Sequence, residues 1–264
     1  MIVDPPAVLT YSSYLALDDV LDAQHPNSEE HDEMLFIVVH QVYELWFKQL
    51  LHEFGKFQQD LTEGHTANAM QAATRAVKIL KVAISQVDIL ETMTPRQFTA
   101  FRDGLGSGSG FQSAQFREIE ATLGRRESKM YSHYPAGSRE RERVERAMNR
   151  PSVFDSLLTY LFIRGYGVPH AALNRDVSAP WEASEDVQAV LAKVYEDDSG
   201  AAHICERLVD IDEAVQEWRY RHVKMVERII GVRPGTGGSS GAAYLRGTLF
   251  SPLFPDLWAA RGLM

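Results

Sequence analysis

Apolar residues recur every three or four positions over two long stretches of this chain, and this spacing constrains the fold more than any other feature. The first stretch contains LFIVVHQVYELWFKQLLHEF, and its seam consists of Phe36, His40, Tyr43, Phe47, Leu50, Phe54, Phe57 and Leu61. The second seam consists of Ile204, Leu208, Ile211, Val215, Trp218, His222, Met225 and Ile229. Such spacing puts the side chains on one face of a helix, so both stretches are predicted to be long, packed helices.

The rest of the chain also favours helices, and strand signals are scarce. The pattern predicts helices over residues 28–61, 66–92, 95–105, 112–123, 151–164, 184–196 and 201–230. Ser28 is the expected N-cap of the first, and Thr94-Pro95 starts a short one. We find no internal repeat and no shift in composition that would mark a domain boundary. The prediction is therefore one all-α domain over residues 1–264, a bundle of long helices preceded by an arm, residues 1–27.

Composition narrows the class of protein. The 264 residues carry a net charge of −9, which argues against a nucleic-acid surface. The stretch Arg139–Arg150 is rich in arginine but alternates with Glu140, Glu142 and Glu145, a pattern typical of a solvated helix face. The single cysteine, Cys205, excludes an internal disulfide and a Cys-rich zinc site, and we expect it to be buried. With neither a signal-peptide pattern nor a long uncharged apolar run, the expected location is the cytoplasm, away from membranes.

The two seam histidines, His40 and His222, are the candidate functional residues. A di-iron carboxylate site would need a Glu three residues before each ligand histidine, and Ile37 and Arg219 stand there instead. The zinc-protease pattern beginning at His52 fails because Lys56 occupies the position of its second histidine. One imidazole could instead hold haem iron while the other lies on the distal side. Spacing alone also allows two histidines that are merely buried in a structural bundle.

Two Gly-rich loops remain. GTGGSSG, residues 235–241, contains a formal G-x-S-x-G match, but this hydrolase motif needs a strand before it, and none is predicted. The dinucleotide pattern G-x-G-x-x-G fails in both loops, because Ser109 and Ser240 stand at the third glycine. Each loop could close over a ligand with its backbone N–H groups or could be a surface connector.

Several sequence blocks nevertheless carry a family resemblance. HDEMLFIVVHQVYELWFKQLLHE, FRDGLGSGSGFQSAQFREIE, WRYRHVKMVERIIG and GTGGSSG resemble the tryptophan 2,3-dioxygenase family, as does YSSYLALDDVLDAQHP near the N-terminus. Members of this family use haem b, with Fe²⁺ in the active form, to insert both atoms of O₂ across the indole C2–C3 bond. The resemblance implies that L-tryptophan becomes N-formyl-L-kynurenine, the first step of the kynurenine pathway.

The resemblance also implies roles for individual residues. His222 corresponds to the proximal iron ligand and His40 to the distal histidine that meets the indole N–H. The implied substrate contacts are Arg102 at the carboxylate, Thr236 at the amino-acid head group, and Phe36 and Phe98 around the indole. The implied haem contacts are Ser109, Gly110 and Trp218. Tyr11 and Tyr14 correspond to residues that complete the pocket of a neighbouring subunit, so a homotetramer, a dimer of dimers, is expected.

Two alternatives to this function remain open from the sequence. The wider superfamily includes members that insert one oxygen atom into alkylated tryptophans and give 2-oxindoles. A haem-binding sensor or carrier would need the histidines but not Arg102 and Thr236 at an amino-acid head group. The sequence leaves open the preference for substituted indoles and the presence of a second tryptophan site.

Overall fold

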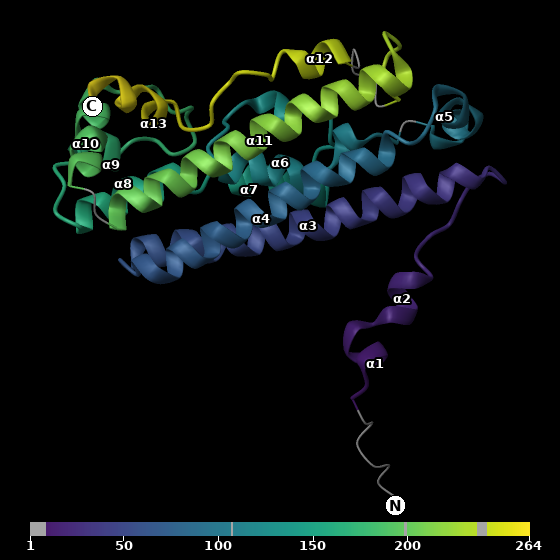
Figure 1. The fold of residues 1–264 in the computed structure, drawn as a ribbon, viewed down its shortest axis with the longest axis horizontal. Coiled ribbons are helices and arrows are strands. Elements are labelled where there is room, and N and C mark those ends of the chain that lie inside the picture. The colour runs from purple at the N-terminus through teal and green to yellow at the C-terminus, as the bar shows by residue number, and fades with distance from the viewer. Residues whose placement is uncertain (1–8, 107, 198–199, 237–241) are drawn as a thin grey trace, which may run out of the picture.

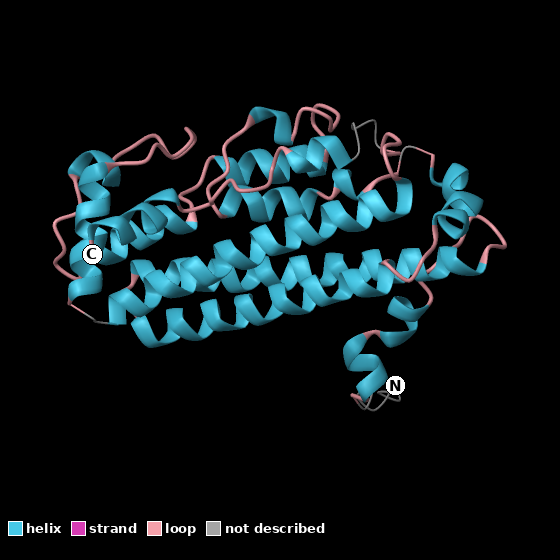
Figure 2. Ribbon diagram, turned by 45° about the horizontal axis from the view of Figure 1, so that its top comes forward, coloured by secondary structure: helices cyan, strands magenta, loops and turns pink. Residues whose placement is uncertain are grey.

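Three long helices form the body of the protein in a computed structural model, which describes residues 9–106, 108–197, 200–236 and 242–264. They are α3 (His31–Thr62), α4 (Thr66–Leu90) and α11 (Gly200–Ile230). The helix α4 packs along both α3 and α11, and the three run side by side (Figures 1 and 2). No strand occurs among the described residues, and the predicted all-α bundle is confirmed.

Shorter helices cover the body and its ends. In chain order they are α1 (Tyr11–Leu15), α2 (Leu17–Leu21), α5 (Pro95–Arg102), α6 (Ala114–Thr122), α7 (Arg139–Met148), α8 (Val153–Ile163), α9 (His170–Leu173), α10 (Glu185–Glu196), α12 (Ala242–Arg246) and α13 (Pro255–Ala259). Short 3₁₀ turns cover Asp103–Leu105, Gly110–Gln112, Ser128–Met130 and Ala260–Leu263. Within the described part of the chain, every helix is too short or too polar to cross a membrane.

The predicted seams are the core of the bundle. On α3, the seam residues from Leu50 to Leu61 are fully buried, and on α11 so are Ile204, Leu208 and Ile211. Each such aliphatic or aromatic side chain contributes about 1.5–3 kcal/mol on burial. Phe36 and His40, on the same seam as Leu50, are only partly buried. The seam therefore leaves the solid core and reaches a cavity at this end of α3.

Helix boundaries follow local hydrogen bonds. The prediction of Ser28 as N-cap is wrong, since α3 begins at His31 after Glu30. The Glu33 carboxylate accepts the hydroxyl of Ser28 at 2.5 Å, along with backbone N–H groups of Ser28 and Asn27. The Ser28 hydroxyl is therefore bonded to Glu33 and does not cap the helix. At α5 the prediction is confirmed, because Thr94 caps the helix in a capping box with Gln97 and Pro95 follows it.

The arginine-rich stretch forms α7, which packs against α6. Val144 and Met148 are its buried residues, while most of its charged side chains face outward, as the mixed-charge pattern predicted. Cys205 is fully buried on α11, also as expected, and burial raises the pKa of its thiol to about 12.

A buried carboxylate on α11 fixes the C-terminal segment to the body. Asp212 accepts the backbone N–H groups of Leu253 and Phe254, at 2.9 and 3.1 Å, and the indole N–H of Trp258 at 2.9 Å. These charge-assisted bonds hold α13 over the far end of the bundle from α5 (Figure 1).

The N-terminal arm stands clear of the body (Figure 1). Neither α1 nor α2 has a buried residue, and Tyr11 and Tyr14 are 75 % and 72 % exposed. The arm joins the body where the Gln24 and Gln41 side chains meet at 2.6 Å. With Leu9, Leu15 and Leu21 also exposed, the arm presents an uncovered apolar surface.

Candidate functional site

A cavity of about 220 Å³ lies where α3, α5, α6 and α11 meet, beside residues 109–113. Nine of the residues singled out in the sequence line it, namely Phe36, His40, Phe98, Arg102, Ser109, Gly110, Trp218, His222 and Thr236. Helical spacing explains this, since Phe36 and His40 are four residues apart on α3 and Trp218 and His222 four apart on α11. Because α3 and α11 both pack on α4, the Phe36–His40 pair and the Trp218–His222 pair line the same cavity.

His40 presents one defined nitrogen to the cavity. Its Nδ1 atom lies 2.7 Å from the backbone oxygen of Phe36, and a carbonyl can only accept, so Nδ1 carries the proton. Burial lowers the pKa of His40, which keeps the imidazole neutral and leaves Nε2 as an acceptor. A Cβ atom at Gly110 would lie 3.9 Å from that Nε2, so any larger side chain there would fill the space in front of His40.

His222 is a neutral imidazole on the α11 side of the cavity. Burial, together with His40 and Arg117, lowers the pKa of His222 to about 4. The ring of Trp218 stacks on it almost in parallel, with centroids 4.9 Å apart and planes at 16°. No hydrogen bond joins the His222 ring to a described residue. A neutral, oriented imidazole is the form that binds a transition metal.

The side chains of Arg102 and Thr236 both donate hydrogen bonds to backbone carbonyl groups at the edge of the cavity. The guanidinium of Arg102 donates to the carbonyl of Pro234 at 2.6 Å. The Thr236 hydroxyl donates to the carbonyl of Gly108, also at 2.6 Å. These bonds join α5 and the first Gly-rich loop to the segment that follows α11. The G-x-S-x-G match at Gly237–Gly241 lies outside the described residues.

Aromatic rings form the wall near His40. The Phe36 ring centroid lies 4.1 Å from that of His40 and 5.9 Å from that of Phe98. Phe101, behind Phe98, meets it edge to face at 5.4 Å. These contacts hold Phe98 in one orientation and give the cavity a flat, apolar side.

A buried ion cluster that the sequence patterns did not predict also borders the cavity, through Arg117, Glu120 and Arg219. Glu120 accepts from Arg117 at 2.6 Å, from Arg125 at 2.7 Å and from Arg219 at 3.0 Å. Although burial opposes ionisation, these three guanidinium groups hold the pKa of Glu120 below its usual range. Only the spacing of Arg117 and Glu120, three apart on α6, could have indicated it.

Tyr11 and Tyr14 do not line the cavity of their own chain. They lie on α1, in the exposed arm, and the structure brings neither of them to His40 or His222. Their predicted role in the pocket of a neighbouring subunit stays a prediction.

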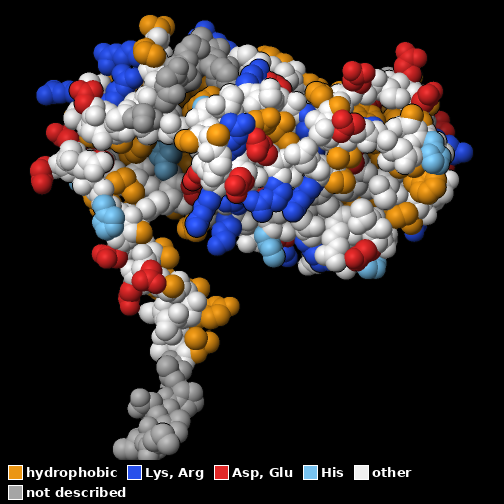
Figure 3. All heavy atoms as spheres, turned by 180° about the vertical axis from the view of Figure 1, so that it is seen from behind, with side chains coloured by type: hydrophobic (Ala, Val, Ile, Leu, Met, Phe, Trp, Pro, Cys, Tyr) orange, Lys and Arg blue, Asp and Glu red, His pale blue; other side chains and the backbone are white. Residues whose placement is uncertain are grey.

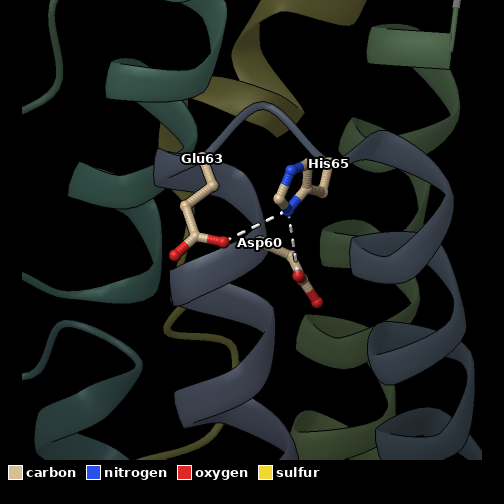
Figure 4. A group of neighbouring side chains, drawn as sticks. All are labelled: Asp60, Glu63 and His65. Atoms are coloured by element: carbon tan, nitrogen blue, oxygen red, sulfur yellow. Dashed lines mark ion pairs between the residues drawn. The ribbon is translucent and has the colours of Figure 1, made fainter.

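A second group of possible metal ligands lies at the turn between α3 and α4 (Figure 4). The Nδ1 atom of His65 is 3.2 Å from the Glu63 carboxylate and 3.7 Å from that of Asp60. The ammonium group of Lys56 already pairs with Asp60 at 2.5 Å. The buried carboxylate thus has a cation, and we assign this group to the turn rather than to a metal.

Comparison with known proteins finds relatives that match this chain over nearly its whole length. The family model described as tryptophan 2,3-dioxygenase matches residues 5–163 and 181–264. A tryptophan 2,3-dioxygenase of Anaeromyxobacter sp. (strain K) is 60 % identical over 259 residues, 98 % of this chain and 97 % of the relative. That of Herpetosiphon aurantiacus is 52 % identical, covering 96 % and 97 % of the two chains, and that of Caulobacter vibrioides is 43 % identical with the same coverage.

The chain belongs to the tryptophan 2,3-dioxygenase family. Membership makes it an oxidoreductase and confirms the resemblance read from the sequence blocks. The oxindole-forming and haem-carrier alternatives are not favoured. The relatives that match this chain over nearly their whole length are named tryptophan 2,3-dioxygenases.

Proposed function

We propose that this member of the family is a haem-dependent dioxygenase that converts L-tryptophan and O₂ into N-formyl-L-kynurenine, with both oxygen atoms entering the product as the C2–C3 bond breaks. The observation that carries the proposal is the arrangement of His40 and His222, two neutral histidines from different helices on the wall of one cavity. No external reductant is needed to balance the reaction, because the substrate supplies the electrons that reduce O₂.

The residues of the cavity fit a haem group. His222 offers a neutral imidazole without a hydrogen-bond partner among the described residues, and Trp218 fixes its plane. We assign His222 as the iron ligand, with Ser109, Gly110 and Trp218 beside the macrocycle. Gly110 leaves the room in front of His40 that a side chain would take. When bound, the haem supplies the ferrous iron at which O₂ is activated.

The same geometry orients an indole amino acid. The Nε2 atom of His40 is an acceptor, so it can hold the indole N–H, while Phe36 and Phe98 confine the ring. Arg102 presents a planar fork to the carboxylate, and Thr236 a hydroxyl to the head group, in place of the carbonyls they hold here. His40 acts in this scheme by positioning the substrate. An indole lacking these groups would leave buried polar atoms unpaired and bind poorly.

We also propose a cytoplasmic homotetramer in which the arm, with Tyr11 and Tyr14, completes the cavity of a neighbouring subunit. The exposed tyrosines and the unburied α1 and α2 support this part of the proposal. Buried in a partner's cavity, the two rings would exclude water from the substrate.

Mass spectrometry of the product formed by reduced, haem-loaded protein under ¹⁸O₂ tests the reaction. N-formyl-L-kynurenine with two labelled atoms is the expected result. A 2-oxindole with a single labelled atom would reassign the chain to monooxygenase chemistry. Haem binding with no product from L-tryptophan or from alkylated tryptophans would favour a carrier.

A further inference from the structure

A row of arginines on α7 faces a groove on the surface of the protein. Arg139, Arg143 and Arg146 follow one another at steps of four and three, so they share one face of the helix, and Arg150 follows just beyond its C-terminal end. They line a groove of about 480 Å³ whose other walls come from α3 and α6. Figure 3 shows Lys and Arg side chains gathered across the middle of this side, where α7 lies.

Most of these arginines lack a partner. Arg143 pairs with Glu118 and also donates to Gln115. The side chains of Arg139, Arg146 and Arg150 make no ion pair or hydrogen bond with any described residue, and all three are exposed. Since only Glu118 and Glu142 oppose the four arginines, the groove lining carries a net charge of +2. On a chain whose net charge is −9, this groove is a local site for an anionic partner.

The length of the row favours an extended partner over a small anion. Arg146 is seven positions after Arg139, which is about 10 Å along the helix at about 1.5 Å per residue, and Arg150 lies beyond the helix end. A lone phosphate or carboxylate could meet one end of such a row only. A segment with several carboxylates at helical spacing could meet more than one arginine of the row at once.

The N-terminal arm is such a segment. Residues 9–30 contain Asp18, Asp19, Asp22, Glu29 and Glu30 and neither lysine nor arginine. The three aspartates are exposed and form no ion pair with a described residue. Asp18 and Asp22 are four residues apart, the same step as Arg139 to Arg143 and Arg146 to Arg150. The arm also exposes Leu21 and other apolar side chains that its own chain leaves uncovered (Figure 3).

We propose that the α7 groove binds the acidic arm of a second copy of this chain, with Asp18, Asp19 and Asp22 facing Arg146 and Arg150 at one end of the row. This inference rests on the proposed oligomer and specifies where the acidic part of the arm docks. Helix α6 separates cavity from groove, since its residue Phe116 lines the first and Thr122 the second. The eight positions from Tyr14 to Asp22 span about 12 Å as a helix and at most about 28 Å extended, so this stretch can cross α6, whose diameter is about 10–12 Å.

Cysteine cross-linking between two differently tagged chains tests the docking. The variants Asp19→Cys and Arg146→Cys are co-expressed, loaded with haem and oxidised under mild conditions. Each carries one new thiol, and Cys205 is fully buried and does not compete. We expect most of the mixed oligomer to run as a disulfide-linked pair of the two tags. The matched control pairs Asp19→Cys with Arg164→Cys, an exposed arginine outside the groove, and should give at least tenfold less product.

Charge reversal gives a second test on the same pair. Adding Arg139→Glu and Arg150→Glu to the Arg146→Cys chain should reduce the cross-link several-fold, and adding Asp18→Arg and Asp22→Arg to its partner should restore it. Raising the salt concentration should reduce the yield for the unreversed pair, because the attraction is between exposed charges.

Absence of the cross-link in an oligomer of confirmed mass, or equal yields with Arg146→Cys and Arg164→Cys, would overturn the docking. A cross-link that ignores charge reversal would overturn the pairing of carboxylates with arginines. Product formation from L-tryptophan, measured on the same samples, keeps this outcome separate from that of the proposed reaction. An active enzyme without the cross-link retains its function and loses only this interface.

Discussion

The Nδ1–H group of His40 donates a hydrogen bond to the backbone carbonyl of Phe36, 2.7 Å away and one helical turn earlier. This bond fixes the tautomer, so that the nitrogen facing the cavity can accept a hydrogen bond but cannot donate one while the ring is neutral. The helix itself thereby prepares His40 to recognise an N–H group.

Replacing His40 with alanine should lower the rate of tryptophan oxidation about 10²-fold, the size of a positioning effect. The loss should be smaller for N1-methyltryptophan, which has no indole N–H to offer. Steady-state kinetics of both substrates measure this difference, and the haem absorption spectrum checks that the site stays loaded. Activity at background level with haem in place would instead point to a direct role in proton transfer.

Arg102→Ala should reduce kcat/KM for L-tryptophan by about 10²-fold, since a charge-assisted bidentate pair with the carboxylate is worth about 1.5–3 kcal/mol. Arg102→Lys should recover only part of this, because an ammonium group cannot form the planar pair. Arg96→Ala is the matched control, an exposed arginine of the same helix that does not line the cavity. Equal effects at positions 96 and 102 would refute the assignment.

His222→Gly should purify with little haem, and added imidazole should restore the haem absorption band by entering the space left by the side chain. His203→Ala, an exposed histidine on the same helix, should bind haem normally. Absorbance titration with haem at several imidazole concentrations measures both. Full haem loading of His222→Gly without imidazole would show that another residue holds the iron.

Glu120→Ala should lower the free energy of unfolding by about 3–5 kcal/mol, since Arg117, Arg125 and Arg219 would remain near the core without their common carboxylate. Urea denaturation followed by circular dichroism gives the value. The control Glu217→Ala changes an exposed glutamate on α11 and should change stability by less than about 0.5 kcal/mol. A small loss for Glu120→Ala would mean that water reaches the cluster.

Tyr43 should make stability fall at high pH. Burial raises the pKa of Tyr43 to about 12, while an unfolded tyrosine ionises near pH ~10. Between these values the native state keeps a proton that the unfolded state has released, so stability falls with rising pH by up to about 1.4 kcal/mol per unit. Tyr43→Phe should lack this part of the slope in urea titrations between pH ~10 and ~12. An unchanged slope would assign the alkaline loss to other groups.

Local patterns determined much of this protein in advance. Steps of three and four identified α3 and α11 as packed helices, because the period of a helix is set within the helix itself. The Thr94 cap was equally readable, since its partner Gln97 is three residues away. Ser28 was not, because the competing carboxylate of Glu33 lies beyond the local capping motif. The sequence blocks were sufficient for the family.

Only the tertiary structure decided which of these residues meet. The spacing marked His40 and His222 on two helices but allowed two unrelated buried histidines, and the packing of α3 and α11 on α4 brings them to one cavity. The Glu120 cluster joins positions 99 residues apart, a distance over which periodicity carries no information. The arginines between 139 and 150 had the sequence pattern of a solvated face, and only the structure shows that four of them line one groove beside α3 and α6. Periodicity fixes which way a side chain points, and packing fixes what it faces.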